Sequence, residues 1–169
     1  PDARSTEYRE WVLATWRQLT GRDSYEPDRD EQFDLDIEAF VVSPFPLNTH
    51  DPVEVGHYFG AISWFLTEVQ PRRGDRVVEL GSGWGHLALM LASIGLDVTA
   101  VDLNPASVEV LRRRASNAGL DITVAQQAFL DFEARDIDLA VFFESFHHCD
   151  DPLRLLDRTV ASLTDTGRI

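Results

Sequence analysis

The feature that most constrains the fold is the stretch VVELGSGWG at residues 77–85, an apolar run that ends in an acid and continues into three glycines. The run has the composition of a short buried strand, and the residues after it have the apolar spacing of a helix. Glycine has no side chain and tolerates positive φ, so a turn with Gly81, Gly83 and Gly85 lets a ligand approach the backbone. The stretch predicts a strand, a ligand-binding loop and a helix in succession.

Strands and helices are predicted to alternate from Arg76 onward. Because parallel strands need crossover helices, this alternation predicts an α/β fold with an open, doubly wound parallel sheet. The ligand of such a sheet lies outside the carboxyl ends of the strands. The expected strands are 76–80, 97–101, 122–125 and 137–143, and the expected helices are 85–93, 104–119 and 151–163.

Residues 1–50 are predicted to form a helical and loop extension, and residues 51–169 the α/β core. An amphipathic helix is expected around 8–19, the acid-dense stretch 22–38 is expected to be loop, and Asp51 and Pro52 are expected to begin a helix that reaches Val69. The aromatic residues of the extension could form a lid over a substrate or pack within an added helical layer. They are Trp11, Trp16, Tyr25, Phe33, Phe40 and Phe45.

Composition excludes several classes of function. Acids outnumber bases 29 to 15, for a formal charge of -14, so nucleic acid and anionic membranes are not expected partners. All the basic residues are arginine, which excludes lysine-based catalysis and favours a GC-rich bacterial source. Cys149 is the only cysteine, so a reducing cytoplasm is the expected compartment. No apolar run approaches the length of a membrane span.

Two carboxylates indicate which ligand the glycine loop binds. Asp102 follows the second expected strand, where a carboxylate accepts hydrogen bonds from ribose hydroxyls, so an adenosine-type cofactor is predicted. Glu79 would repel a pyrophosphate and attract the ammonium and sulfonium groups of S-adenosylmethionine. The spacing of Gly83, Gly85 and Ala88 also fits a dinucleotide fingerprint. The purely structural alternative is that Gly81 to Gly85 only make a tight turn and that Glu79 pairs with an arginine.

The stretch FFESFHHCDDP, at the end of the fourth expected strand, is the second concentration of polar side chains. Its carboxylate and imidazole groups could bind a metal, but one strand end rarely supplies a full set of ligands, so no metal is expected. Asp151 could cap the next helix while one histidine satisfies a buried backbone group. Cys149 is expected to be a plain small side chain.

Residues 54–169 resemble the class I S-adenosylmethionine-dependent methyltransferases, through VVELGSGWG, VTAVDLNP, IDLAVFFESFHH, DDPLRLL and LTDTGRI. The resemblance implies a Rossmann-like methyltransferase fold whose sheet continues past the turn-like TDTGR, so that this chain holds four strands and the start of a fifth. It also implies S-adenosyl-L-methionine as the cofactor and a small-molecule methyl acceptor with an O, N or C nucleophile. An NAD-dependent oxidoreductase and a non-catalytic interaction module are the alternatives.

The resemblance also implies roles for individual residues. His147, the first choice, or His148 could accept a proton from the acceptor. In the loop after the third strand, Ala128 replaces the acid that binds the adenine amino group in many members, and Gln127 or Asp131 could substitute for it. The residues expected around the cofactor are Glu79, Gly81, Ser82, Gly83 and Gly85 near its methionine part, Asp102 at the ribose, Leu103, Ala128 and Phe129 at the adenine, and Glu144 as a positioning group.

Overall fold

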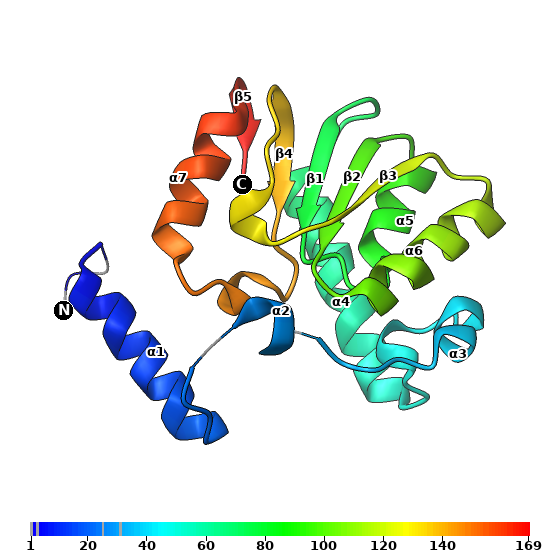
Figure 1. Cartoon of the computed structure of the whole chain (residues 1–169). Helices are drawn as coiled ribbons and strands as arrows, with labels where there is room; N and C mark the ends of the chain where they lie inside the picture. The colour runs from blue at the N-terminus through cyan, green and yellow to red at the C-terminus, as the bar shows by residue number, and fades with distance from the viewer. Residues whose placement is uncertain (1, 3, 25, 31) are drawn as a thin grey trace.

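The structure, a computed structural model, describes residues 2, 4–24, 26–30 and 32–169. Its centre is a five-stranded sheet in the order β3-β2-β1-β4-β5 (Figure 1). Every neighbouring pair of strands is parallel, and the order reverses beside β1, where β4 pairs on the side away from β2. The predicted open parallel α/β sheet is confirmed. Its strands are β1 Arg76–Leu80, β2 Asp97–Asp102, β3 Ile122–Gln126, β4 Ile137–Val141 and β5 Leu163–Arg168.

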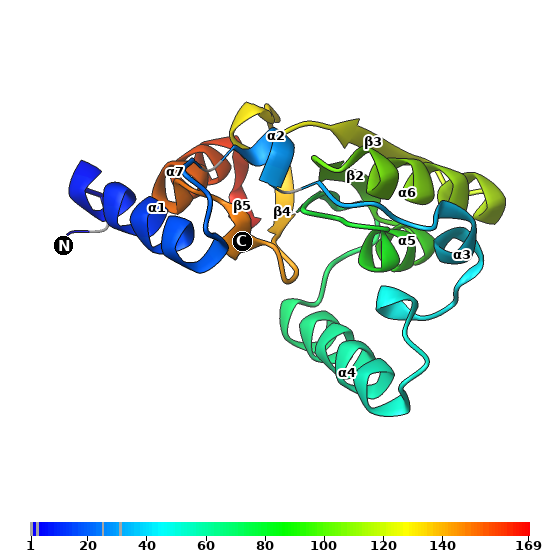
Figure 2. The same cartoon turned by 60° about the horizontal axis from the view of Figure 1, so that its bottom comes forward.

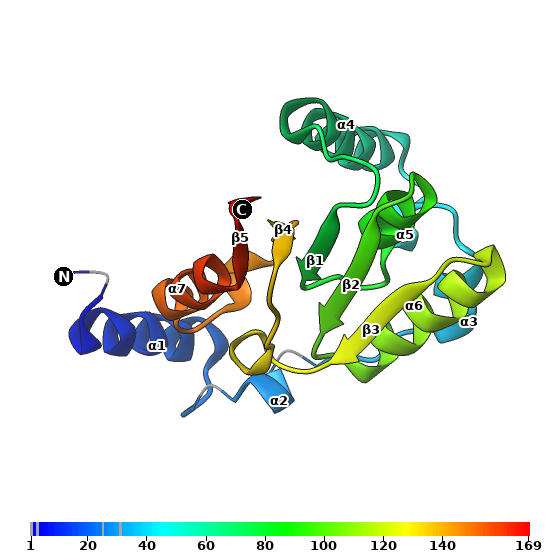
Figure 3. The same cartoon turned by 90° about the horizontal axis from the view of Figure 1, so that it is seen from above.

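Helices cover both faces of the sheet, because the side chains of each strand alternate between two cores. Val77 packs in the core that includes Ile62, Leu91 and Leu111, which come from the helices on one face. Val78 packs in the other core with Leu155, from the helix on the opposite face. The helices of the first face are α4 Pro52–Val69, α5 His86–Ser93 and α6 Pro105–Ala118, and α7 Pro152–Ser162 covers the second face (Figure 3).

The N-terminal segment runs along the outside of this core. It comprises α1 Thr6–Thr20, α2 Pro27–Asp30, α3 Ile37–Val42 and the 3-10 turn η1 Pro46–Asn48. Helix α1 lies beside α7 (Figures 2 and 3), where Arg4 pairs with Asp157 at 2.9 Å, and none of the residues of α1 is buried. Helix α3 is held against α6 by two hydrogen bonds from Arg113 to Glu38, of 2.7 and 2.9 Å.

Local capping explains where the predicted helices begin. Asp51 accepts a hydrogen bond from the Val53 amide at the start of α4, and Asn104 accepts bonds from the first turn of α6. Asp151 caps α7 in the same way, through the Arg154 amide. The expected helices at these three positions are confirmed.

Three predictions about local structure are wrong. The expected loop 22–38 contains α2 and the first residues of α3, because the Asp36 side chain accepts a hydrogen bond from the Ala39 amide and starts a helix there. The turn-like TDTGR is part of β5, in which Gly167 lets the backbone approach Ile137 closely. Strand β4 ends at Val141, two residues before the expected end at 143, and the chain then turns at Glu144, which has a left-handed backbone conformation.

Two further 3-10 turns lie in the loops of the core, η2 Phe129–Asp131 after β3 and η3 Phe146–His148 after β4. Of the aromatic residues expected in the N-terminal extension, Tyr25 lies outside the described residues. A search of the described part of the chain finds no helix whose length and apolarity would suit a membrane crossing.

Candidate functional site

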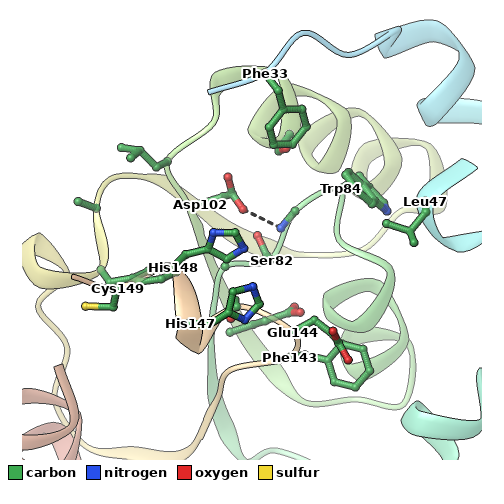
Figure 4. A pocket seen from close by; sticks show the side chains of 18 of the residues that line it. Phe33, Leu47, Ser82, Trp84, Asp102, Phe143, Glu144, His147, His148 and Cys149 are labelled. Atoms are coloured by element: carbon green, nitrogen blue, oxygen red, sulfur yellow. Dashed lines mark hydrogen bonds between the residues drawn. The ribbon is translucent and has the colours of Figure 1, made fainter. Parts of the chain in front are cut away.

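A cavity of about 470 Å³ lies at the carboxyl ends of the strands (Figure 4). Its walls come from the glycine loop after β1, the ends of β2 and β4, the loop after β3 and the N-terminal segment. This is the position where open α/β sheets bind their ligands, at the reversal of strand order beside β1. The expected site residues that line it are Glu79, Gly81, Ser82, Gly83, Asp102, Leu103, Ala128, Phe129, Glu144, His147 and His148.

The three loop glycines all have positive φ, but only Gly83 has open space where a side chain would lie. A Cβ at Gly81 would lie 2.3 Å from the Ser145 Cβ, and a Cβ at Gly85 would lie 2.1 Å from Leu111 Cδ1. A Cβ at Gly83 would meet nothing within 4 Å. The sequence-based reason for these glycines, approach of a ligand, therefore applies to Gly83 alone. Gly85 does not line the cavity and instead gives α6 room to pack.

Glu79 is buried at the base of the cavity, with 2% of its surface exposed. Burial, followed by the negative charge of Asp102, raises the pKa of Glu79 to about 8, although a backbone hydrogen bond at Ala88 opposes the shift. Its Oε2 atom has no hydrogen-bond partner. The structure therefore places a carboxyl group that lacks a counter-charge beside the glycine loop, and the arginine pairing of the structural alternative is not seen among the described residues.

Asp102 holds the glycine loop in place from the end of β2. Its Oδ2 accepts a 2.7 Å hydrogen bond from the Gly83 amide, drawn dashed in Figure 4, and its Oδ1 accepts a 2.8 Å bond from the Asn104 amide. Burial raises the pKa of Asp102, and these two bonds limit the rise. Each oxygen of a carboxylate has a second lone pair, so Asp102 retains the capacity to accept hydrogen bonds from a ligand's hydroxyl groups.

Three polar atoms on the cavity wall are buried without a hydrogen-bond partner among the residues the structure describes. They are Glu79 Oε2, Ser82 Oγ and Ser107 Oγ. Buried polar groups are normally paired, because an unpaired one costs roughly 1 to 3 kcal/mol. A polar ligand would supply these partners. Together with the open backbone at Gly83, they fit an adenosine cofactor that carries an amino-acid group.

The wall beyond Asp102 is apolar. Leu103 follows β2, and Ala128, Phe129 and Leu130 come from the loop after β3. Phe129 lies in the core under α7 and contacts Phe142 with a centroid distance of 6.4 Å, so its ring is fixed. Gln127 and Asp131, the expected substitutes for an adenine-binding acid, do not line the cavity.

The residues after β4 form the opposite wall. His147 and His148 are both exposed, and their ring centroids lie 4.2 Å apart. Asp150 pairs with Arg9 of α1 at 2.6 Å. Burial raises the pKa of the Cys149 thiol, which makes it a poor nucleophile, as expected. Among the described residues, no three His, Cys, Asp or Glu side chains are grouped as ligands of a metal ion.

Tyr58 and Ser107 are among the cavity-lining residues that sequence reasoning missed. Tyr58 lies on α4, and its ring contacts Phe143 at a centroid distance of 5.4 Å. The polar end of Tyr58 amid an apolar helix was a usable signal. Ser107 sits in the first turn of α6, where Asn104 Oδ1 accepts a hydrogen bond from its amide. Its side chain is 1% exposed, and the helix cap alone could not reveal that.

Comparison with known proteins identifies the family. Residues 77–167 match the family model described as a methyltransferase domain. A ubiquinone biosynthesis O-methyltransferase of Xylella fastidiosa (strain 9a5c) is 29% identical over 127 residues, which cover 73% of this chain and 48% of the relative. The Methylocella silvestris protein of the same name is 32% identical, over 78% of this chain and 57% of the relative.

Among solved structures, a coclaurine N-methyltransferase bound to N-methylheliamine and SAH aligns with a TM-score of 0.66 and 20% identity. The alignment covers 95% of this chain and 55% of that protein, and it shows a shared fold. The chain spans about half the length of the curated relatives it matches. With more than half of its residues matched by the family model, the chain belongs to the class I S-adenosylmethionine-dependent methyltransferases.

Proposed function

We propose that the protein transfers a methyl group from S-adenosyl-L-methionine to a small organic acceptor. One observation carries this proposal: three unpartnered buried polar atoms, on Glu79, Ser82 and Ser107, face one cavity beside an open glycine backbone. A cationic ligand suits this cavity, because a positive charge near Glu79 would favour its ionised form. A pyrophosphate would be repelled there, which disfavours the dinucleotide alternative.

The proposed cofactor site follows the cavity wall. Glu79, Gly81, Ser82 and Gly83 would surround the amino-acid end, and Asp102 would accept hydrogen bonds from the ribose. Leu103, Ala128 and Phe129 would pack on the adenine, whose amino group would meet backbone and water, since the acid of many members is replaced by Ala128. Gly85 is left out of this set because it packs against Leu111.

The bound cofactor would supply a methyl group on a positively charged sulfur. The protein's own residues then mainly have to align the acceptor and exclude water. His147 lines the cavity and is exposed, so its imidazole is placed to accept a proton from the acceptor, and the His148 ring lies beside it. These roles predict few catalytic side chains and no nucleophile.

The N-terminal segment is the proposed lid. Phe33 and Leu47 line the cavity. The Phe33 carbonyl accepts a 3.0 Å hydrogen bond from the Asn104 side chain, and Phe40 packs on Trp84 of the glycine loop at 4.9 Å between centroids. Residues 33–47 are therefore held at the cap of α6 through Phe33 and at the glycine loop through Phe40.

The expected setting of this activity is the cytoplasm. A single cysteine, Cys149, suits a reducing compartment. The formal charge of -14 argues against nucleic acid and anionic membranes as partners. The names of the curated relatives, ubiquinone biosynthesis O-methyltransferases of bacteria, support a small organic acceptor.

The test is a calorimetric titration of the protein with S-adenosylhomocysteine and, separately, with NADH. We expect binding of S-adenosylhomocysteine, at least tenfold weaker in Asp102→Ala, and no binding of NADH. Glu109→Gln, on the exposed surface of α6, is the control for a lost carboxylate and should bind like the wild type. Binding of NADH alone would revive the oxidoreductase, and binding of neither ligand would contradict the proposal.

A further inference from the structure

The charge of the cavity wall is one-sided. Four carboxylates line the cavity, from Glu79, Asp102, Glu144 and Asp150, and the described part of the wall contains no arginine. Asp150 is neutralised by Arg9 from outside. Asp102 is committed to two backbone amides. Glu79 is buried, and its raised pKa of about 8 keeps it protonated near neutral pH until a cation binds beside it. Glu144 is exposed to the cavity and has no ion-pair partner among the described residues, so its carboxylate leaves negative charge to be balanced by a ligand.

Glu144 belongs to a distinct part of this wall. Together with Tyr58 and Phe143 it forms what we call the acidic aromatic corner. In Figure 4, Glu144 and Phe143 lie on the opposite side of the cavity from Phe33. The Tyr58 and Phe143 rings meet edge to face, with centroids 5.4 Å apart and planes at 71°. Burial raises the pKa of Tyr58, and the charges of Glu79 and Glu144 add to the rise while the charge of Arg114 opposes it, so the hydroxyl stays protonated.

The backbone of Glu144 supports a functional role for the corner. Its φ is +59°, in the left-handed region that disfavours residues with a side chain by roughly 1 to 2 kcal/mol. Glycine would relieve this strain, yet the position carries a charged side chain exposed to the cavity. Strained residues of this kind concentrate at functional sites.

A carboxylate beside aromatic rings is the surrounding that an organic cation prefers, because the ring faces attract positive charge in addition to the ion pair. An anionic acceptor would face the carboxylate of Glu144 with no arginine on the described wall to balance it. We propose that the methyl acceptor is an amine on an apolar, aromatic body without an anionic group, and that the acidic aromatic corner binds its nitrogen. Glu144 would then bind the acceptor, whereas the sequence predicted that it positions the cofactor.

The proposal rests on the proposed methyl transfer and specifies its chemistry. The protonated amine first gives a proton to the imidazole of His147, which leaves a lone pair on nitrogen. The nitrogen then forms a bond to the methyl carbon as the bond from that carbon to sulfur breaks. The positive charge passes from sulfur to nitrogen, so the methylated product is again a cation that the carboxylate of Glu144 can balance.

Three ligands with the same phenol ring test the proposal: tyramine, tyrosol and 4-hydroxyphenylacetate, which end in an ammonium, a hydroxyl and a carboxylate. Each is titrated into the protein saturated with S-adenosylhomocysteine, so that binding is measured without turnover. We expect tyramine to bind more tightly than tyrosol by about fivefold or more, the factor that one charge pair about 4 Å apart provides in water. The carboxylate should bind most weakly.

Glu144→Gln should reduce the preference for tyramine over tyrosol to twofold or less and leave S-adenosylhomocysteine binding unchanged. Glu109→Gln, a matched loss of an exposed carboxylate on α6, should keep the full preference. A preference for the carboxylate ligand, equal binding of the three, or binding of none would overturn the proposal. So would a Glu144→Gln variant that loses S-adenosylhomocysteine, because the corner would then belong to the cofactor. Failure of the wild type to bind S-adenosylhomocysteine would instead refute the methyltransferase function itself.

Discussion

Glu79→Gln is expected to stabilise the ligand-free protein at alkaline pH. Glu79 is 2% exposed, and burial together with Asp102 raises its pKa from 4.5 to about 8. Below pH 4.5 the folded and unfolded chains both hold this proton. Between pH 4.5 and about 8 only the folded chain holds it, so stability falls as the pH rises through this window.

The difference between the two pKa values corresponds to roughly 5 kcal/mol of lost stability above pH 8. The glutamine amide removes the charge but leaves a buried polar group without a partner, which costs roughly 1 to 3 kcal/mol. We therefore expect Glu79→Gln to raise the free energy of unfolding by roughly 2 to 4 kcal/mol at pH 8.5. At pH 5 Glu79 holds its proton, so only the cost of the unpaired amide remains and the variant should be less stable by roughly 1 to 3 kcal/mol.

Urea unfolding of both proteins at pH 5, 6, 7 and 8.5 measures this difference directly, because all other titrating groups are shared. Glu109→Gln, which removes an exposed carboxylate from α6, is the matched control and should follow the wild type at every pH. Parallel stability curves for the wild type and Glu79→Gln would refute the reasoning, since they would mean that Glu79 ionises normally in the folded protein.

Three further predictions concern the glycine loop, the start of α5 and the cap of α6. Gly85→Ala would place a Cβ 2.1 Å from a buried leucine carbon and should destabilise the protein by about 3 kcal/mol or more in urea unfolding. Gly83→Ala should cost only roughly 1 to 2 kcal/mol of stability but abolish S-adenosylhomocysteine binding in calorimetry. Equal effects of the two variants in both assays would contradict this. Burial, with help from a nearby arginine, lowers the pKa of His86 to about 4, so its NMR signals should not titrate between pH 8 and 5, and a midpoint near 6.5 would be inconsistent with that burial. Asn104→Ala should lose about 1 to 2 kcal/mol with the cap of α6 and speed proteolysis near Phe33, and an unchanged cleavage rate would show that the tie does not hold the segment.

The strands and the capped helices could be predicted because their signals are local. Asn104 and Pro105 begin α6 through hydrogen bonds within one turn, and Gly119 ends it in the left-handed conformation. Helix α3 has only six residues and depends on contacts distant in sequence. Arg113 holds Glu38, and Trp84 packs on Phe40. A short acid-rich segment with such support reads as loop when the sequence alone is considered.

The position of the site could be predicted from the sequence, but the packing that explains some of its residues could not. Motif spacing placed Glu79 and Asp102 at the ends of neighbouring strands, and both line the cavity. The packing of Gly81 against Ser145 and of Gly85 against Leu111 depends on partners 64 and 26 residues away, which no local pattern contains. The acidic aromatic corner likewise could not be predicted, because it forms where α4 brings Tyr58 to the residues after β4.

A crystal structure of the protein grown with S-adenosylhomocysteine tests the central claim most directly. The account predicts density in the cavity, with the ribose hydroxyls within hydrogen-bonding distance of Asp102 and the amino-acid end against the Gly83 backbone and Glu79. It also predicts that the acidic aromatic corner remains open for an acceptor. Adenosine bound elsewhere, or an empty cavity at saturating ligand concentration, would contradict the assignment of this cavity as the cofactor site.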